Sequence, residues 1–400
     1  MRTSARTLLL IFAFAIPWEY SLDFGAPLGN AARLAGLAVL AAAIPATLRE
    51  GRLRTPGSLH WLSIALFLWL CASYFWSIDP TVTLNKLPGY AQELMIVWLV
   101  GEFVDSERDP INLLGAWLAG CAVLAGLTLS AVLIAAHGTE QIRFFAVGED
   151  PNDTARFLAL GLPIAMYLAV NARHRWQRWV TILYLPIAVI AIVATASRGG
   201  FVEALVAFAF CATLVRRGLR GLVGGTLVLS LILAGGAMLV IPHGTIERIA
   251  TLSQQIQGGD FNQRINIWQQ GWRAFQSAPV LGHGAGTFVE AAGLSPIDTA
   301  HNTALSILVE GGISGLALGV AIVAHCAVMA FAARGSLRIV LIALLAVWAV
   351  ASFVGTTGES RITWLLFATV AAAARLNATY NPAGVETKVE SGPLRAGAGA

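Results

Sequence analysis

Long apolar segments, each followed by a short polar connection, alternate along almost the whole chain. Most segments run for about 16–25 residues, the length that an α-helix needs to cross a hydrocarbon layer of about 30 Å. The pattern predicts an all-α integral membrane protein with about twelve membrane-spanning helices, at residues 7–20, 31–48, 61–75, 89–103, 111–135, 154–172, 179–195, 200–215, 221–241, 301–331, 339–353 and 361–376.

One connection is much longer than the others and divides the chain into four parts. We expect nine spans with short loops in residues 1–241, one large loop in 242–300, and three further spans in 301–376. Residues 377–400 are rich in Gly, Ala and Pro and show no apolar period, so they predict a disordered tail.

The large loop contains a segment with helical periodicity. Apolar side chains recur near helical spacing in Asn262–Gln276, and Pro279 ends the pattern. The pattern predicts an amphipathic helix whose stripe of Ile265, Trp268, Trp272 and Phe275 packs onto the membrane domain or enters the lipid interface.

Arginine clusters in short connections give the orientation. Because cytoplasmic loops carry an excess of Lys and Arg, these clusters predict that both termini are cytoplasmic and that the large loop is periplasmic. The connection at 102–109 is an exception, since it is not net basic. The clusters are Arg49, Arg52 and Arg54; Arg173, Arg175 and Arg178; Arg216, Arg217 and Arg220; and Arg334 with Arg338.

The first apolar segment has two interpretations. Arg2 and Arg6, followed by an apolar run with Ala13 and Ala15, are compatible with a cleavable signal peptide. We favour an uncleaved first helix, because the next span follows after a short Gly/Pro connection. Either interpretation leaves the orientation of the later spans unchanged.

Composition excludes several classes of function. The chain is 57% hydrophobic and 12% charged, about half the charged fraction of a soluble domain. The net charge of +4 is dispersed at the ends of apolar segments, so a nucleic-acid partner is not expected. All four cysteines lie in apolar segments, and we expect neither a disulfide nor a cysteine metal site.

Several arginines on the predicted periplasmic side are not explained by the orientation rule. Arg198 stands at the crest of a hairpin before Gly199 and Gly200, and Arg264 lies in the first turn of the amphipathic helix. Arginine is suited to bidentate phosphate contacts, so we treat both as anion-binding candidates. The structural alternatives are snorkelling to lipid phosphate, an ion pair between Arg198 and Glu203, and a solvated helix face for Arg264. The others are Arg143, Arg156, Arg248, Arg273 and Arg361.

His301 is the candidate proton acceptor. Asp298 or Thr299 is expected to cap the tenth span, which leaves His301 in the first helical turn. The positive end of the helix dipole disfavours imidazolium there and keeps the ring neutral. The structural alternative is a capping or interfacial histidine.

A metal site is not expected. The loop contains His243, Asp260, His283, Asp298 and His301, but no spacing places two of them on one helix face. Glu310 lies inside the tenth span before Gly311, Gly312 and Gly315, and we expect it to stabilise a kink or to bind a neighbouring helix.

Several short motifs occur in a familiar order between residues 148 and 316. They are GEDPNDTA at Gly148–Ala155, ASRGGFVEAL around Arg198, FNQRINIW around Arg264, GHGAGTF at Gly282–Phe288, and HNTALSILVEGGISGL at His301–Leu316. Together they resemble the motifs of the O-antigen ligase and polymerase superfamily, the Wzy_C-type membrane enzymes. The first five expected spans contain none of these motifs and agree with the superfamily only in their hydrophobic character.

The resemblance implies a periplasmic glycosyltransferase of the bacterial inner membrane, with a GT-C-like helical bundle and one large periplasmic loop. Its donor would be glycan on undecaprenyl pyrophosphate. In the ligase branch, which the chain length and short tail favour, the acceptor is the lipid A–core oligosaccharide. Such ligases are taken to be inverting and metal-independent, so no cofactor is implied. Membrane lipids are the remaining partners.

With this donor, the candidate residues have natural roles. An activated polyprenyl pyrophosphate needs no covalent intermediate, so we expect Arg198 and Arg264 to clamp the diphosphate and His301 to take the acceptor proton. Arg143 and Arg156 are possible supporting residues. Alternative functions are an O-antigen polymerase, a protein O-oligosaccharyltransferase and, outside enzymes, a lipid-linked oligosaccharide flippase. A transporter would be expected to show repeated halves, which the sequence lacks.

Overall fold

The computed structural model describes residues 1–25, 28–135, 142–214 and 263–379, together with isolated positions between 221 and 245. In these residues the regular elements are helices, apart from one isolated bridge between Asp23 and Asn30. The expected all-α class is therefore confirmed for the described part. The ninth expected span (221–241), the first part of the large loop and the expected tail beyond Thr379 lie outside it, as do His243, Arg248 and Asp260.

The helices coincide closely with the expected spans. Seven are long and apolar enough to cross a membrane: Ala31–Glu50, Ser58–Phe75, Arg108–Ile134, Pro151–Asn171, Arg175–Ala194, Thr303–Ala332 and Gly335–Val354. The total of about twelve remains a prediction. The long helices are α1 (Arg2–Ala15), α2 (Ala31–Glu50), α3 (Ser58–Ala72), α4 (Pro80–Phe103), α5 (Arg108–Ala135), α6 (Pro151–Asn171), α7 (Arg175–Ala194), α8 (Arg198–Leu214), α14 (Thr303–Ala332), α15 (Gly335–Val354) and α16 (Arg361–Thr379).

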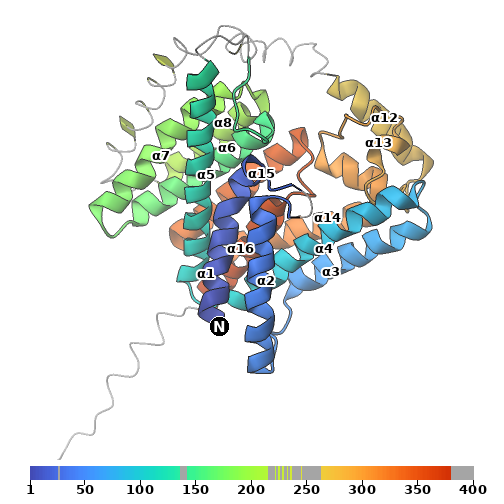
Figure 1. Cartoon of the computed structure of the whole chain (residues 1–400), viewed down its shortest axis with the longest axis horizontal. Helices are drawn as coiled ribbons and strands as arrows, with labels where there is room; N and C mark the ends of the chain where they lie inside the picture. Colours follow the sequence, from blue (N-terminus) through green and yellow to red (C-terminus); the bar gives the residue numbers. More distant parts are fainter. Residues whose placement is uncertain are drawn as a thin grey trace, which may run out of the picture.

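The helices form a bundle with a smaller unit at one edge (Figure 1). α1 lies against α2 and α5, while α6 packs against α7, α8 and α15. α5 packs against α6 and so joins these two groups, and α16 packs against α4 and α14. The large loop contributes α12 (Arg264–Ser277) and the short α13 (Phe288–Ala291), which lie against α14 beside the α3–α4 pair (Figure 1). α16 extends to Thr379, three residues beyond the predicted end of the last span.

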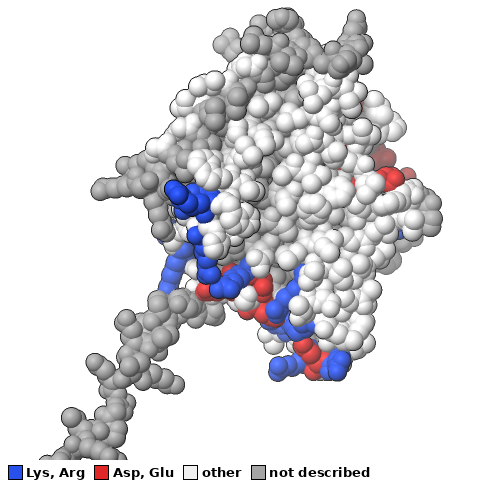
Figure 2. All heavy atoms as spheres, turned by 60° about the vertical axis from the view of Figure 1, so that its left-hand side comes forward, with Lys and Arg blue, Asp and Glu red and all other residues white. Residues whose placement is uncertain are grey.

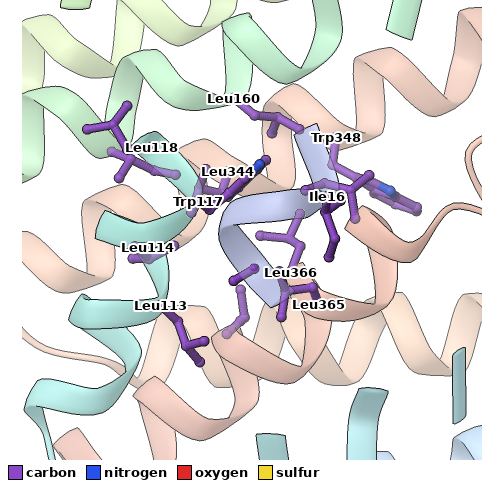
Figure 3. Packing of buried hydrophobic residues seen from close by; sticks show 14 of the residues in the cluster. Ile16, Leu113, Leu114, Trp117, Leu118, Leu160, Leu344, Trp348, Leu365 and Leu366 are labelled. Atoms are coloured by element: carbon purple, nitrogen blue, oxygen red, sulfur yellow. The ribbon is translucent and has the colours of Figure 1, made fainter. Parts of the chain in front are cut away.

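The apolar core lies where α5, α6, α15 and α16 meet the 3₁₀ turn after α1 (Figure 3). Trp117 from α5, Leu160 from α6 and Leu366 from α16 are all buried there. Small residues let the helices approach, as helix packing in lipid requires. A Cβ on Gly200 of α8 would collide with Ala155 of α6. α6 is thereby held at the centre, and its first turn becomes a fixed wall of the site described below.

Ion pairs hold together the end of the bundle that carries the N-terminus. Arg2 bonds to Glu50 at 2.6 Å and to Glu102 at 3.1 Å, and Arg6 and Arg54 both pair with Asp105. Two acidic residues of the 102–109 connection, Glu102 and Asp105, are therefore matched by arginines of α1 and of the connection after α2, which offsets their charge at this exception to the orientation rule. Most charged side chains visible in Figure 2 lie toward this end, below a broad uncharged face.

Helix α14 is interrupted one third of the way along. Gly312 has φ +65° and ψ −168°, a backbone conformation that is essentially restricted to glycine. The interruption breaks the ladder of helical hydrogen bonds inside a membrane-spanning segment. Unsatisfied backbone groups there cost several kcal/mol each, so other parts of the protein must bond to them.

The glycine-rich segment that precedes α14 supplies most of these bonds. His283 N donates to Val309 O at 2.9 Å, Gly284 N donates to Glu310 O at 2.9 Å, and Ile313 N donates to Pro279 O at 2.9 Å. The indole Nε1 of Trp69 in α3 donates to Gly311 O at 2.9 Å. Residues 279–286, hereafter the glycine segment, are thus bound into the break in α14.

The glycine segment is also fixed from the side of α3 and α4. Ala285 N donates to Ser73 Oγ at 3.0 Å, and Thr83 Oγ1 donates to Ala285 O at 3.0 Å. Glu310 completes the junction, because its carboxylate accepts from Gly286 N at 2.7 Å and from Ser306 Oγ at 3.0 Å. Of the two expectations for Glu310, these bonds agree with a role at the kink, since they join the glycine segment to α14.

We predict that Gly312→Ala destabilises the protein, because a Cβ would collide with Val280 O and the backbone conformation is strained for alanine. Strain of this kind costs about 1–3 kcal/mol. Gly126→Ala in α5 is the matched control, since nothing lies within 4 Å of the place that its added methyl group would occupy. The Tm in detergent, followed by tryptophan fluorescence, should fall only for Gly312→Ala. Equal Tm values for both variants would show that the break tolerates a side chain.

Candidate active site

His301 lies immediately before the helix cap of α14. Asn302 is the cap: its Oδ1 accepts from Leu305 N at 2.9 Å, and α14 begins at Thr303. The prediction that Asp298 or Thr299 caps the helix, with His301 in its first turn, is wrong. Asparagine is a strong N-cap residue and here stands next to the apolar run. His301 instead adopts a left-handed conformation with φ +46°.

Neighbouring hydrogen bonds fix the segment that carries His301. Thr299 Oγ1 lies 3.2 Å from His301 Nδ1. Trp268 Nε1 of α12 donates to Ala300 O at 3.1 Å, and Asn302 Nδ2 donates to Phe353 O at 3.2 Å. With Thr299 engaging Nδ1, Nε2 is the ring nitrogen available to a ligand.

The amphipathic helix of the large loop is confirmed as α12, with Arg264 as its first residue. Its buried face differs from the predicted stripe: Ile267, Gly271 and Ala274 are buried, whereas Ile265 and Trp272 are exposed. The small residues face inward because Phe288 and Leu305 pack directly against Gly271. This close packing fixes the distance between Arg264 and the start of α14.

Arg198 begins α8 after a tight turn from α7. Ser197 Oγ donates to Asn152 Oδ1 at 3.0 Å, and Arg143 donates to the same oxygen at 2.9 Å and to Thr195 O at 3.1 Å. Arg143 and the turn before Arg198 are therefore joined through Asn152, in the first turn of α6. Asp150 caps α6 by accepting from Asn152 N at 2.7 Å.

Electrostatic effects show that the candidate residues from separate segments converge. Burial lowers the pKa of Arg264, and the positive charges of Arg198 and Arg156 lower it further, while Asp150 opposes them. Burial also lowers the pKa of His301, with a further contribution from Arg264. The imidazole is therefore biased toward its neutral form, as expected, although burial and arginine charge are the causes instead of a helix dipole.

Arg156 is the most enclosed of these arginines. It is 5% exposed and pairs with Asp153 at 2.7 Å, yet its Nε has no hydrogen-bond partner among the described residues. Glu203 in α8 is also buried, and its Oε2 has no partner in the same part of the chain. A buried guanidinium with an unused donor and a buried carboxylate with an unused acceptor are both costly, so this region offers hydrogen bonds of both kinds to a ligand.

Backbone strain gathers at the same place. Three described non-glycine residues have positive φ: Ala196 at +50°, Gln263 at +64° and His301 at +46°. Gln263 lies next to the candidate Arg264, and Ala196 lies two residues before the candidate Arg198. The third is the candidate His301 itself. Strained conformations of this kind cluster at functional sites, where the surrounding structure maintains them.

Two cavities meet beside the start of α14. One, of about 520 Å³, is apolar and runs between α3, α14, α15 and α16 to Asn302 and Thr303. The other, of about 610 Å³, is polar and is lined by Asp298, Thr299 and Ala300, next to His301. Both are bordered by Ser306, Glu310, Thr356 and Glu359.

The sequence analysis did not identify Asp150 and Asn152 as site residues. The sequence feature that marks them is the Asp-Pro-Asn-Asp run, a typical helix start with a capping aspartate and proline at the first helical position.

His283 bonds to Ala274 O at 2.8 Å, which makes it part of the loop structure. Within the described residues, no group of three or more His, Cys, Asp or Glu side chains has an arrangement suited to a metal ion.

The site thus belongs to a helical membrane protein in which arginines, a neutral-biased histidine and an apolar cavity meet at one end of the bundle. Residues 183–320 match the family model described as O-antigen ligase, Wzy_C. The match covers α8, α12, the glycine segment and the first part of α14, and it supports the O-antigen ligase and polymerase family. No curated protein matches the chain.

We predict a pH-dependent contribution of His301 to stability. Because its pKa is lower in the folded protein than the ordinary 6.5, the unfolded chain takes up the proton first as the pH falls below that value. Stability is therefore lost as the pH drops from 6.5 through the folded pKa. The Tm of the wild type should fall more steeply between about pH 7 and pH 5 than the Tm of His301→Gln. Parallel Tm curves would contradict the lowered pKa.

Proposed function

We propose that this protein is an O-antigen ligase of the bacterial inner membrane, with both termini in the cytoplasm. It transfers O-antigen polysaccharide from undecaprenyl pyrophosphate to lipid A–core oligosaccharide at the periplasmic face. The observation that carries the proposal is that the charge of Arg264 lowers the pKa of His301, while Arg198 and Arg156 are near enough to Arg264 to lower its own pKa. The family match over residues 183–320 is in accord with it.

The donor combines a long apolar chain with a diphosphate, and the site offers a complement to each part. The apolar cavity suits the polyprenyl chain, because Leu66, Ile307 and Phe353 are among its lining residues and it ends beside Asn302. The arginines suit the diphosphate, since guanidinium groups form bidentate bonds to phosphate oxygens. Their positive charge also replaces the divalent cation on which many glycosyltransferases depend.

The transfer is a single displacement. The acceptor hydroxyl oxygen forms a bond to the anomeric carbon of the donor sugar as the bond from that carbon to the pyrophosphate oxygen breaks. His301 takes the hydroxyl proton, and undecaprenyl pyrophosphate leaves with the bonding electron pair, stabilised by Arg198 and Arg264. Attack opposite the leaving group inverts the anomeric configuration. Arg143 and Arg156 support the clamp, through Asn152 and Asp153.

A polymerase or a protein O-oligosaccharyltransferase would use the same donor chemistry with another acceptor, and a flippase would bind the donor without transfer. These functions are separated by supplying purified protein with undecaprenyl-pyrophosphate-linked glycan, with and without lipid A–core, in EDTA. A ligase forms product only with the acceptor. Lengthened lipid-linked glycan without acceptor indicates a polymerase, and donor transport across proteoliposomes without transfer indicates a flippase.

We predict that His301→Ala lowers the transfer rate about 10²–10⁴-fold, the usual contribution of a general base, while donor binding is retained. His174→Ala is the control, because His174 is exposed in the connection between α6 and α7. Single-turnover transfer in EDTA measures the rate. Near-wild-type transfer by His301→Ala would exclude the base assignment.

We predict that Arg264→Ala lowers kcat/KM for the donor about 10- to 100-fold, because a charge-assisted phosphate contact is lost. Arg264→Lys should restore part of the activity, since lysine keeps the charge without the bidentate geometry. Arg273→Ala is the matched control on the same helix, with an exposed side chain. Equal donor kinetics for Arg264→Ala and Arg273→Ala would rule out the clamp.

A further inference from the structure

The polar cavity of about 610 Å³ beside His301 has a pronounced excess of acidic side chains. None of the proposed phosphate-binding arginines lines it. Its two basic residues are Lys86 and Arg361, and we refer to it as the acidic cavity. Its acidic residues are Glu19, Glu93, Glu149, Asp153, Glu290, Asp298, Glu310 and Glu359.

Both basic residues are already paired within the wall. Lys86 Nζ lies 2.5 Å from Glu359 Oε2, and Arg361 Nη1 lies 2.5 Å from Glu19 Oε2. Their charges are therefore offset by neighbouring carboxylates. The acidic groups that remain outnumber the basic ones and give the cavity a partial negative potential, because burial raises the pKa of Glu149 to about 7 and leaves this carboxyl only partly charged at neutral pH.

Most of the buried carboxylates in the wall have protein partners, and Glu93 differs in that one of its two oxygens has none among the described residues. Glu149 accepts from Tyr20 N at 2.8 Å and from Ser21 N at 3.1 Å. Glu93 is 4% exposed, and its Oε2 has no hydrogen-bond partner among the described residues. A buried carboxylate oxygen without a partner is unfavourable. Its position in the cavity wall therefore points to a ligand that donates hydrogen bonds.

We propose that the acidic cavity receives the acceptor sugar and selects neutral or amino sugars over uronic or phosphorylated ones. The proposal rests on the proposed function, because it assigns the acceptor side of that same site. Sugar hydroxyl and ammonium groups donate hydrogen bonds to carboxylates, and a protonated amine also gains from the negative potential. An anionic sugar would be repelled by the same groups.

The position of the cavity suits an acceptor. Thr299 lies in its wall and is 3.2 Å from His301 Nδ1, so one side chain separates the cavity from the ring of the proposed base. Ser306 and Glu310 border both cavities, so the acceptor and the lipid-linked donor meet at one boundary.

Binding of soluble oligosaccharides tests the selectivity without requiring transfer. We expect purified wild-type protein to bind fully deacetylated chitotetraose most tightly, maltotetraose more weakly and tetragalacturonate not at all, as measured by isothermal titration calorimetry in uncharged detergent. Comparable affinity for tetragalacturonate would overturn the proposal. Loss of chitotetraose binding in EDTA would also overturn it, in favour of a metal-filled cavity.

Three variants localise the binding. Glu93→Gln should weaken binding of deacetylated chitotetraose about tenfold, because the amide replaces one acceptor oxygen of the buried carboxyl with an NH₂ donor. Glu290→Gln, at an exposed position of the wall, should weaken it about two- to fivefold and carries little risk to folding. Glu107→Gln, an exposed residue next to the start of α5, is the matched control. Unchanged binding in both Glu93→Gln and Glu290→Gln would refute the assignment.

Transfer kinetics separate this inference from the proposed function. Glu93→Gln should raise the KM for lipid A–core about tenfold and leave the KM for the donor unchanged. Transfer with an unaltered acceptor KM would overturn the acceptor assignment while the ligase function stands. Selective oligosaccharide binding that depends on Glu93, without any transfer, would support the cavity as a glycan site and refute the ligase function.

Discussion

The structure depends on one requirement of the bilayer, that backbone groups inside it find hydrogen-bond partners within the protein. The break in α14 at Gly312 leaves such groups without helical partners, and the glycine segment and Trp69 provide replacements. This arrangement joins the large loop, the α3–α4 pair and α14. Separate hydrogen bonds from Trp268 and Asn302 hold the segment with His301 at the start of α14.

Much of the fold follows from the sequence because the thickness of a bilayer sets the length of an apolar helix. Ten of the eleven described long helices begin within a few residues of an expected span, whereas α4 begins at Pro80, nine residues before its expected start. From the sequence, the break in α14 could be predicted only as a possible kink near Glu310. Hydropathy depends on composition and carries no information on backbone angles. The burial pattern of α12 was also not predictable, because it depends on how Phe288 and Leu305 meet Gly271.

For the candidate site, the sequence identified the charges that membrane orientation does not explain, and these converge. The charges of Arg198 and Arg156 lower the pKa of Arg264, although the three arginines come from three different helices. Asp150 and Asn152 were missed, because a capping residue has the same sequence signal whether or not it lies beside a site. The positive φ at His301 was also inaccessible from sequence, since tertiary contacts maintain it.

The glycine segment has a consequence for how related chains are to be compared. Gly282, Gly284, Gly286 and Gly312 are needed for backbone geometry, since each has positive φ and a side chain would collide with its neighbours. None of them supplies a reacting group. A chain that retained these glycines and lost the histidine would keep the architecture without the proton acceptor. If two chains share these glycines, they can be expected to share the backbone structure of this region. Whether they also share the chemistry must be judged from His301 and the arginines.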